Sequence, residues 1–536
     1  MKNCIKKIKL LFLFASVVLV GCSDALDVEN KNAISLDGFY DTAENFDLGL
    51  KGAYSTLRAP ISYEWMLSEI RSDNTFMNNY GTSNAQNLQV LSNDVFEAPS
   101  FDLFIEQYWA TTYKSIRSIN GLSEGLLTSY NNATGTIDYQ TVSASFPLSV
   151  AERKRVSGEA SFMRAYHYFN LVRLYGGVFL IDKEINATDA LEIPRSSVED
   201  IYRFIVADLK NAVANCSTAK FSAAAGTGGA ATKWAAQALL AKVYLTLGQK
   251  IDALPLLTDV ITNSGHNLIT AGTNPYADVF SAANEMNAEI VFAIRFKSGA
   301  LGYGSPLSNR FSSQVDLKLT AQGLVYPTGT RDGFNNPTPE FYDSYAATDK
   351  RRDFNIKVFK PSGTAADPTK WTYWSGKHNI AVTVLNDSEL DWPVLRFSDV
   401  LLMYCEADGT NNTTTLGYLN RVHTRAGLTA LTATDVATPA LYEKAVANER
   451  RWEFAIENQR WFDLLRFNKT MSTINAKAVM DNHFLLMEPF YIQYAAPYTT
   501  AQLQAKTADP KFNLLPIPNV EIVTNTSQVI PNNPGY

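Results

Sequence analysis

The sequence predicts a mainly α-helical fold made of stacked helix pairs, with a second half that is richer in loops. Residues 155–175 form the longest expected helix, which ends at Gly176-Gly177 and carries apolar side chains on two faces. A helix with two apolar faces is covered on both of them, so it belongs inside a layered stack. Residues 238–261 add a helix pair with residues at tetratricopeptide offsets, namely Ala241, Tyr244, Gly248 and Ala253.

Further helix pairs are expected at residues 159–213 and 393–428, where apolar residues recur at helical spacing. Long insertions separate the pairs, which excludes a tandem array with an even period. The sequence therefore favours a helical scaffold with loops inserted between its repeats.

The remaining elements follow from local patterns along the chain. We expect a polar, irregular segment at 62–98 and a Gly/Ala-rich loop at 223–229. The largest insertion, residues 265–392, is rich in Gly, Pro, Asn and aromatic residues and contains one expected strand at 289–296. Helix resumes at Pro393, and the tail of the chain is extended. The other expected helices are 45–58, 101–130, 198–214 and 441–465.

The first 22 residues have the pattern of a lipoprotein signal. Four lysines flank the start of an apolar run over residues 10–20, which is too short to span a bilayer as a stable anchor. The run ends in Leu19-Val20-Gly21-Cys22, which resembles a bacterial lipobox with cleavage before the cysteine. We therefore expect residues 1–21 to be a signal peptide, Cys22 to carry lipid, and residues 22–34 to form a tether. The alternative is a secreted protein in which this cysteine is accidental.

Charge and cysteine content exclude other classes of protein. The net charge is −6, with no basic tract beyond the N-terminus, which argues against a nucleic-acid-binding surface. Cys4 leaves with the signal and Cys22 takes lipid, so Cys216 and Cys405 remain and no disulfide framework is expected.

The amino-acid sequence of the long helix resembles that of one protein family. The run Arg-Ala-Tyr-His-Tyr-Phe-Asn-Leu-Val-Arg-Leu-Tyr-Gly at 164–176 resembles the signature helix of the SusD/RagB family, the cell-surface nutrient-binding lipoproteins of Bacteroidetes. Further passages in both halves of the chain also resemble this family, namely 193–212, 231–248, 392–407, 447–467 and the closing segments 514–522 and 532–536.

This resemblance implies a fold and a role. The implied fold is a right-handed superhelix of about four tetratricopeptide-like helix pairs, packed against a more irregular C-terminal half. We accordingly expect an N-terminal helical portion at 35–265 and a loop-rich C-terminal portion at 266–536 that together form one compact unit. Members of the family sit as a lid on a SusC-like TonB-dependent transporter in the outer membrane, and they capture glycans or, in some cases, peptides for import.

The sequence gives no pattern for catalysis or for a cofactor. Its five histidines have no metal-ligand spacing, and Gly302-Tyr303-Gly304-Ser305 lacks the glycine that follows the serine of a nucleophile elbow. Glu449 and Glu453 lie in an Arg-rich helix, which favours a structural lattice of charges over an acid–base pair. A structural metal such as calcium stays possible because Asp and Asn are common in the loops, but no calcium-loop spacing supports it. We therefore expect no cofactor and no enzyme activity.

Three clusters in the insertions are the candidate glycan-binding residues. A sugar can cover the face of an aromatic ring, a contact worth roughly 1–3 kcal/mol, so a site needs two or three rings with polar groups beside them. The clusters, in order of preference, are Trp371 with Tyr373 and Trp374; Tyr303 with Asn309 and Arg310; and Trp65 with Asn78, Asn79 and Tyr80. Each ring could instead be a core residue that fixes its loop. The tryptophans in or beside helices are expected to be packed, namely Trp109, Trp234, Trp392, Trp452 and Trp461.

The sequence thus predicts a lipid-anchored protein of the outer-membrane surface that binds an oligosaccharide and delivers it to a SusC-like transporter. Three alternatives stay open. A charged groove would favour peptide capture, and an apolar concave face without rings would favour a scaffold that binds only protein. Two carboxylates facing each other across a pocket would favour a glycoside hydrolase.

Overall fold

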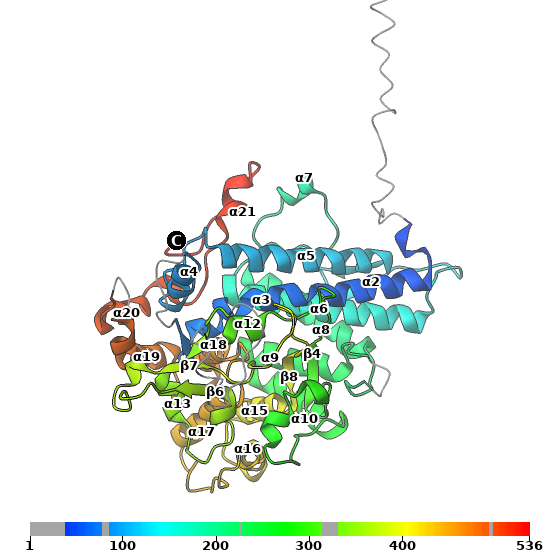
Figure 1. Cartoon of the computed structure of the whole chain (residues 1–536). Helices are drawn as coiled ribbons and strands as arrows, with labels where there is room; N and C mark the ends of the chain where they lie inside the picture. The colour runs from blue at the N-terminus through cyan, green and yellow to red at the C-terminus, as the bar shows by residue number, and fades with distance from the viewer. Residues whose placement is uncertain (1–37, 78–84, 224–227, 314–330, 493–496) are drawn as a thin grey trace, which may run out of the picture.

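The computed structural model describes residues 38–77, 85–223, 228–313, 331–492 and 497–536. Within these ranges the chain is mainly helical, and its strands are short and paired (Figure 1). Every helix in the described ranges is too short or too polar to cross a membrane. The predicted signal, Cys22 and the tether lie outside the described residues, as do Asn78, Asn79 and Tyr80.

The N-terminal half consists of helices that pack in pairs. Helix α6 packs on α8, α9 packs on α10, and both α2 and α3 pack on α5. Figure 1 shows α2, α5 and α6 running side by side. This arrangement confirms the predicted fold class. The helices are α2 (Ala43–Thr56), α3 (Arg58–Leu67), α4 (Ala85–Asp94), α5 (Leu103–Gly125), α6 (Val150–Tyr175), α7 (Ala187–Ala190), α8 (Val198–Asn215), α9 (Lys233–Leu247) and α10 (Lys250–Asn263).

Helix α6 is the interior helix that its two apolar faces predict. From Val156 to Tyr175 every residue except Arg173 is buried. The helix begins at the cap Ser149, whose hydroxyl accepts a hydrogen bond from the Glu152 backbone N–H. It ends at Gly176 with φ of 69° and ψ of −127°. This φ is positive, as expected, but the ψ differs from that of a left-handed helical cap, which corrects the prediction for this residue.

Helices α9 and α10 join the two halves of the molecule. Gly248 turns the chain between them in the left-handed conformation, with φ of 82° and ψ of 7°, as the repeat pattern predicts. Helix α10 then packs against α15 of the C-terminal half, and α9 packs against α18.

The described residues form four antiparallel strand pairs, and the C-terminal half adds short and medium helices. The pairs are β1 (Thr75–Phe76) with β5 (Asn336–Pro337), β2 (Thr128–Asn131) with β3 (Thr136–Tyr139), β4 (Ile290–Ile294) with β8 (Trp392–Arg396), and β6 (Ile356–Phe359) with β7 (Thr372–Ser375), although β2 and β3 form a hairpin in the N-terminal half. The helices are α11 (Pro275–Asp278), α12 (Leu307–Phe311), α13 (Pro339–Ser344), α14 (Arg352–Asn355), α15 (Phe397–Asp408), α16 (Thr413–Arg425), α17 (Pro439–Glu453), α18 (Arg460–Thr470), α19 (Ala476–Tyr491), α20 (Thr500–Lys506) and α21 (Asn519–Thr524).

The predicted start of helix at Pro393 is wrong because pairing with a distant strand decides the structure there. Residues 392–396 form β8, paired with β4, so helix resumes at Phe397 and not at Pro393. Pro393 lacks an N–H, and it is tolerated where the register of this strand pair shifts. The segment 62–98 is also less irregular than predicted, since α3 runs to Leu67 and α4 covers Ala85–Asp94.

The helix predicted over 441–465 is in fact two helices, α17 and α18. The chain between them turns through Ile456 and Asn458, which both have positive φ. Its carbonyl groups accept hydrogen bonds from side chains of other segments instead of from helical N–H groups, for example from the Lys377 ammonium at Ala455. Interactions with distant residues therefore replace the missing helical bonds.

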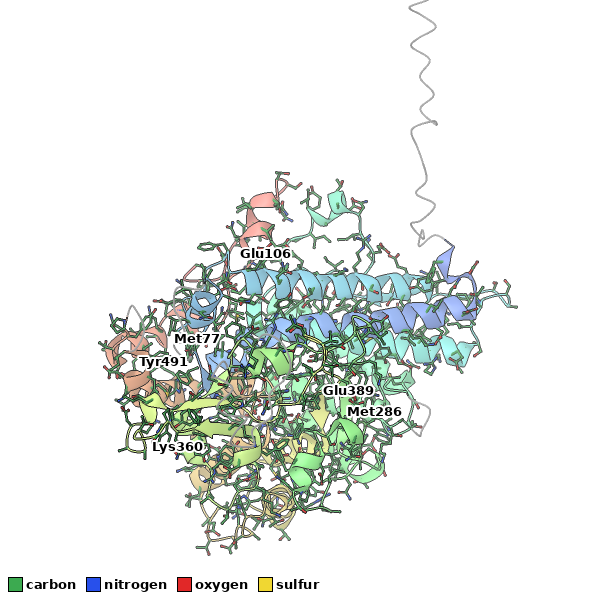
Figure 2. The ribbon with its side chains drawn as sticks, in the orientation of Figure 1. Met77, Glu106, Met286, Lys360, Glu389 and Tyr491 are labelled. Carbon is green, nitrogen blue, oxygen red and sulfur yellow. The ribbon has the colours of Figure 1, made fainter. Side chains whose placement is uncertain are left out.

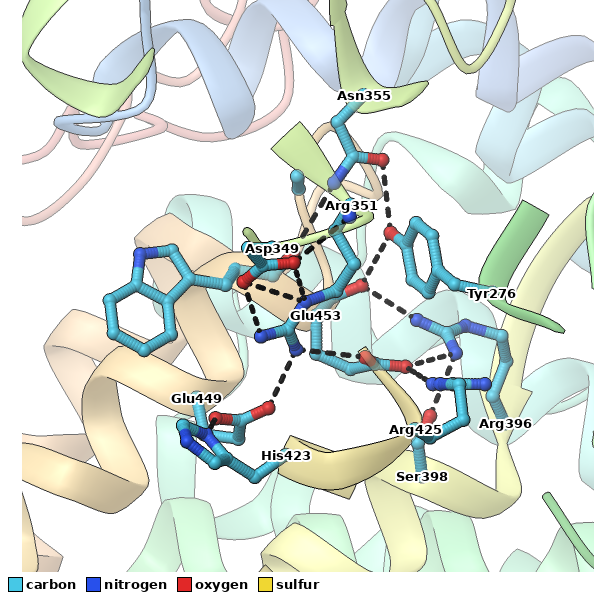
Figure 3. A network of polar contacts seen from close by, with 12 residues as sticks. Tyr276, Asp349, Arg351, Asn355, Arg396, Ser398, His423, Arg425, Glu449 and Glu453 are labelled. Atoms are coloured by element: carbon cyan, nitrogen blue, oxygen red, sulfur yellow. Dashed lines mark hydrogen bonds and ion pairs between the residues drawn. The ribbon is translucent and has the colours of Figure 1, made fainter. Parts of the chain in front are cut away.

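A buried network of ion pairs holds this half together (Figure 3). Glu453 lies at its centre, with one carboxylate oxygen 2.8 Å from Arg396 Nη1 and close to Arg425, and the other 3.2 Å from Arg351 Nη1. Glu449 bonds to Arg351 and to His423 in the same network. The prediction that Glu449 and Glu453 serve a structural lattice of charges is confirmed.

Candidate functional site

The first predicted cluster lies on β7, and most of it is buried. The side chains of Tyr373 and Trp374 are 1% and 0% exposed, so neither offers a ring face to a ligand in this conformation. This corrects the expectation that they form an open platform. Trp371 is half-buried just before the strand, where the Lys360 ammonium lies 3.8 Å from its ring centre.

The third cluster is represented by Trp65, which is also a core residue. Its ring packs between Phe311 and Phe334, with ring centres 5.3 and 5.7 Å away, and it is fully buried. The expectation that it stacks on a ligand is therefore wrong for this conformation. The structure nevertheless brings the cluster close to the second one, because Phe311 directly follows Arg310 on α12.

The second cluster keeps its most accessible ring. Tyr303 is 48% exposed, whereas Asn309 is buried and accepts a hydrogen bond from the Asn386 backbone N–H at 2.9 Å. Arg310 is partly exposed, and its guanidinium lies 5.9 Å from the ring centre of Tyr63. Thus Asn309 holds the loop in place, while Tyr303 and Arg310 reach the surface.

Two ring–cation pairs join α3 to the segment 303–310. Arg58 of α3 lies over Tyr303, with 4.6 Å between the guanidinium carbon and the ring centre, and Arg310 lies over Tyr63 of α3. Arg58 and Tyr63 are about 7.5 Å apart along the helix axis. An exposed ring–cation pair of this kind contributes about 0.5–1 kcal/mol to the stability of the fold. The cation covers only one face of each ring.

The pair formed by Trp371 and Lys360 lies elsewhere on the molecule. Figure 2 shows Lys360 well separated from Glu389, whose carboxylate lies 3.3 Å from Lys297 Nζ. The Lys297 backbone N–H donates a hydrogen bond to the Tyr303 carbonyl. Because Glu389 pairs with Lys297, the position of Glu389 in Figure 2 shows where the Tyr303 loop lies. The predicted rings therefore do not form one continuous shelf.

A cavity of about 730 Å³ opens beside Tyr303. Helix α2, the first turns of α6, strand β4 and the backbone at 228–230 line it. The hydrophobic side chains Leu50, Leu57 and Ile294 contribute to the lining and are buried. The polar lining residues are Asp47, Lys51, Tyr54, Ser55, Arg58, Glu152, Arg155, Glu159, Ser217, Arg295 and Tyr303.

Glu159 is the buried acid of this cavity. Its carboxylate accepts hydrogen bonds from the Tyr54 hydroxyl at 2.8 Å and from Arg155 Nη1 at 2.5 Å. Burial raises the pKa of Glu159 above its ordinary value, although Arg155 and Tyr54 act in the opposite direction. Glu152 binds the same arginine from the same face of α6, so these two acids stand on one wall and do not face each other across the cavity.

Sequence reasoning missed Arg58, Tyr63 and Tyr54. Arg58 and Tyr54 lie in expected helices, and nothing in the local pattern separates them from ordinary surface residues. Tyr63 stands two residues before Trp65, so its proximity to a predicted cluster was the one available signal.

Within the described residues, no group of three or more His, Cys, Asp or Glu side chains could hold a metal ion. Burial lowers the pKa of His167 and His378 to about 3 and that of His266 and His483 to about 4. These imidazoles are therefore neutral at physiological pH. The described site offers ring faces, fixed charges and a cavity, which are features for binding.

The helical scaffold, with its ring-bearing segments and cavity, defines a helical-repeat protein of the ligand-binding kind. Two family models match adjoining parts of the chain. The SusD family model matches residues 295–536, and a SusD-like model described as "Starch-binding associating with outer membrane" matches residues 24–245. The chain belongs to the SusD/RagB family.

Relatives and solved structures agree with this assignment. A SusD-like protein of Bacteroides ovatus is 28% identical over 380 residues, and the match covers 63% of each chain, which is less than two thirds of that relative's length. A structure titled laminarin binding SusD-like protein is 20% identical, with a TM-score of 0.69, and the match covers 93% of this chain and all of that one. Surface glycan-binding protein A from Bacteroides thetaiotaomicron, in complex with laminarihexaose, is 19% identical, with a TM-score of 0.66 and coverage of 92% and 99%. The two structural similarities show a shared fold.

Proposed function

We propose that this chain is a cell-surface glycan-binding lipoprotein that captures an oligosaccharide and delivers it to a SusC-like TonB-dependent transporter. The observation that carries the proposal is the half-exposed ring of Tyr303 at a cavity of about 730 Å³ with polar and apolar walls. A cavity of this size falls within the range of about 300–1,000 Å³ that is typical of small-molecule sites.

The comparisons support a glycan as the ligand. One matching family model carries starch binding in its description, and the two similar structures bind laminarin or hold laminarihexaose. A ring with one free face and neighbouring polar groups is the combination that a sugar requires, because the sugar's C–H face covers the ring while its hydroxyl groups form hydrogen bonds.

The anchor and the transporter are part of the proposal. The lipobox-like sequence at residues 19–22 supports lipid attachment at Cys22, and the association with the outer membrane in the family description supports that location. The proposed role involves no covalent chemistry. The cavity acids Glu152 and Glu159 both form ion pairs with Arg155, which supports a structural role for them over a role as an acid–base pair.

Peptide capture is the second candidate, and one observation favours it. The cavity wall carries ion pairs of both signs, such as Lys51 with Asp47 and Arg155 with Glu152. A charged groove of this kind could bind the charged side chains or termini of a peptide.

Affinity electrophoresis of the mature chain against a panel of soluble polysaccharides tests the proposed function. We expect at least one polysaccharide to retard the wild-type protein. Tyr303→Ala should reduce the retardation, and the binding free energy derived from it should weaken by about 1–3 kcal/mol. Phe101→Ala is the matched control, because Phe101 is 73% exposed and outside the site. Failure of every polysaccharide, together with binding of a peptide library, would refute the glycan proposal in favour of peptide capture.

A further inference from the structure

We propose that the captured oligosaccharide is acidic, and that Arg58 binds its carboxylate or sulfate group while a sugar ring covers the free face of Tyr303. This inference rests on the proposed function and narrows it to a class of glycan. The site is the cavity beside Tyr303, with Arg58 in its wall.

The ion pairs of the cavity distinguish Arg58 from the other cations that line it. Lys51 lies 2.6 Å from Asp47, and Arg155 lies 2.9 Å from Glu152 and 2.5 Å from Glu159. Arg295 lies 2.8 Å from Glu285 and also contacts Asp391. Arg58 has no carboxylate partner within 4.0 Å among the described residues, so its charge is the one that these cavity acids leave unneutralised.

Neighbouring groups hold the Arg58 guanidinium in place without neutralising it. Its Nη1 donates to the Arg295 carbonyl at 3.2 Å, and its Nη2 donates to the Ser55 hydroxyl at 2.5 Å. These two bonds use two of the five N–H donors of a guanidinium. The pKa of Arg58 is lowered by burial, which reflects the cost of partly removing an unpaired cation from water. An acidic group of a ligand would offset this cost, and a neutral hydroxyl group would do so less well.

The position of Arg58 also fits a ligand that stacks. Its guanidinium covers one face of Tyr303, so a sugar would stack on the other face, and an acidic group of the glycan would reach the cation around the edge of the ring. The pair of Trp371 and Lys360 repeats this arrangement on another part of the surface, although Lys360 also interacts with the nearby carboxylate of Asp343.

The acids nearby limit where the negative group can bind. Asp47, Glu152 and Glu159 line the cavity, and each is paired with a cation, while Glu285 and Asp391 face Arg295. These carboxylates would repel an acidic group that bound beside them. The acidic group is therefore expected at the Arg58 and Tyr303 end only.

Isothermal titration of the mature chain with three polysaccharides tests the inference. The probes are polygalacturonate, which carries carboxylates, a sulfated galactan, and neutral laminarin. We expect one of the two acidic polymers to bind at least about tenfold more tightly than laminarin, with an affinity that falls as sodium chloride rises from 0.05 to 0.5 M. Which acidic polymer binds distinguishes a carboxylate from a sulfate.

Variants assign the effect to Arg58. Arg58→Gln should weaken binding of the acidic polymer about tenfold, and Arg58→Lys, which keeps the charge, should weaken it less. The control is Arg117→Gln, since Arg117 is a 71% exposed arginine on α5 outside the cavity, and it should bind like wild type. The salt dependence of the wild-type protein needs no variant, so the inference can be tested even if Arg58→Gln fails to fold.

The outcomes separate this inference from the proposed function. Laminarin bound as tightly as the tighter-binding of the two acidic polymers, or an affinity for that polymer that does not depend on salt, would overturn the inference and leave glycan binding intact. The same holds if folded Arg58→Gln binds the acidic polymer like wild type. Binding of none of these three polysaccharides, together with failure of the whole panel in affinity electrophoresis, would overturn both.

Discussion

Replacing Glu453 with Gln tests whether the buried ion network holds the C-terminal half. The change keeps the volume of the side chain and removes a charge that contacts Arg351, Arg396 and Arg425. Removing one partner of a buried ion pair costs about 3–5 kcal/mol, because the remaining charge stays buried.

The composition of the network sets the expected magnitude within this range. Its cations are Arg351, Arg396, Arg425 and Lys377, and its acids are Asp349, Glu289, Glu449, Glu453 and Glu457. After the substitution the remaining acids still match the cations in number, so we expect a loss near the lower limit, about 3 kcal/mol.

Urea denaturation at pH 7 measures this loss as a lower transition midpoint at unchanged slope. Asp47→Asn is the control, since it removes an acid from the exposed pair with Lys51 and should cost less than about 1 kcal/mol. Burial alone would raise the pKa of Glu453, but Arg425, Arg396 and Arg351 lower it well below its ordinary value. Its contribution is therefore present above about pH 4.3 and is lost as pH falls, so the difference between wild type and Glu453→Gln should shrink at pH 3. A midpoint shift no larger than that of Asp47→Asn would refute this account of the network.

Two further predictions concern the backbone and a buried acid. Gly248→Ala should destabilise the protein by about 1–2 kcal/mol, because the φ of Gly248 is 82°. Gly52 lies within α2, and no atom lies within 4 Å of an added Cβ, so Gly52→Ala should stabilise the protein by about 0.5–1 kcal/mol in the same urea titration. Equal effects of the two substitutions would contradict the conformational argument. Burial raises the pKa of Asp94 to about 8, although bonds from Met77 and Tyr491 act in the opposite direction. The folded protein thus keeps a proton that the unfolded chain loses, so the free energy of unfolding should fall as pH rises from about 4 to 8. Asp94→Asn should make this fall smaller, and an identical pH dependence in both proteins would refute the assignment.

The helical scaffold could be predicted because its signals are local. The apolar faces and terminal glycine of α6, and the small residues of the α9–α10 pair, each specify a helix from neighbouring residues alone. The family resemblance rests on these passages and on further passages of the C-terminal half, such as 392–407 and 447–467. Where contacts between distant segments decide the structure, as for β8 on β4 and the break between α17 and α18, the local pattern misled.

The candidate site was less predictable for the same reason. Trp65 and Trp374 occur in polar, aromatic-rich passages, but whether such a ring packs or faces water depends on residues far along the chain, such as Phe334 for Trp65. Tyr303 was predicted and is exposed. Arg58 was missed because its importance depends on Tyr303, which lies in another segment and becomes its neighbour only in the fold.

A crystal structure of the mature chain bound to the oligosaccharide that it retains tests the central claim most directly. That claim is that a rigid helical scaffold presents Tyr303 as the ring on which a sugar stacks. We predict a sugar ring within about 4.5 Å of the free face of Tyr303, with Trp65 and Trp374 still buried. A sugar bound away from Tyr303, or on Trp374 after that ring has turned outward, would contradict it.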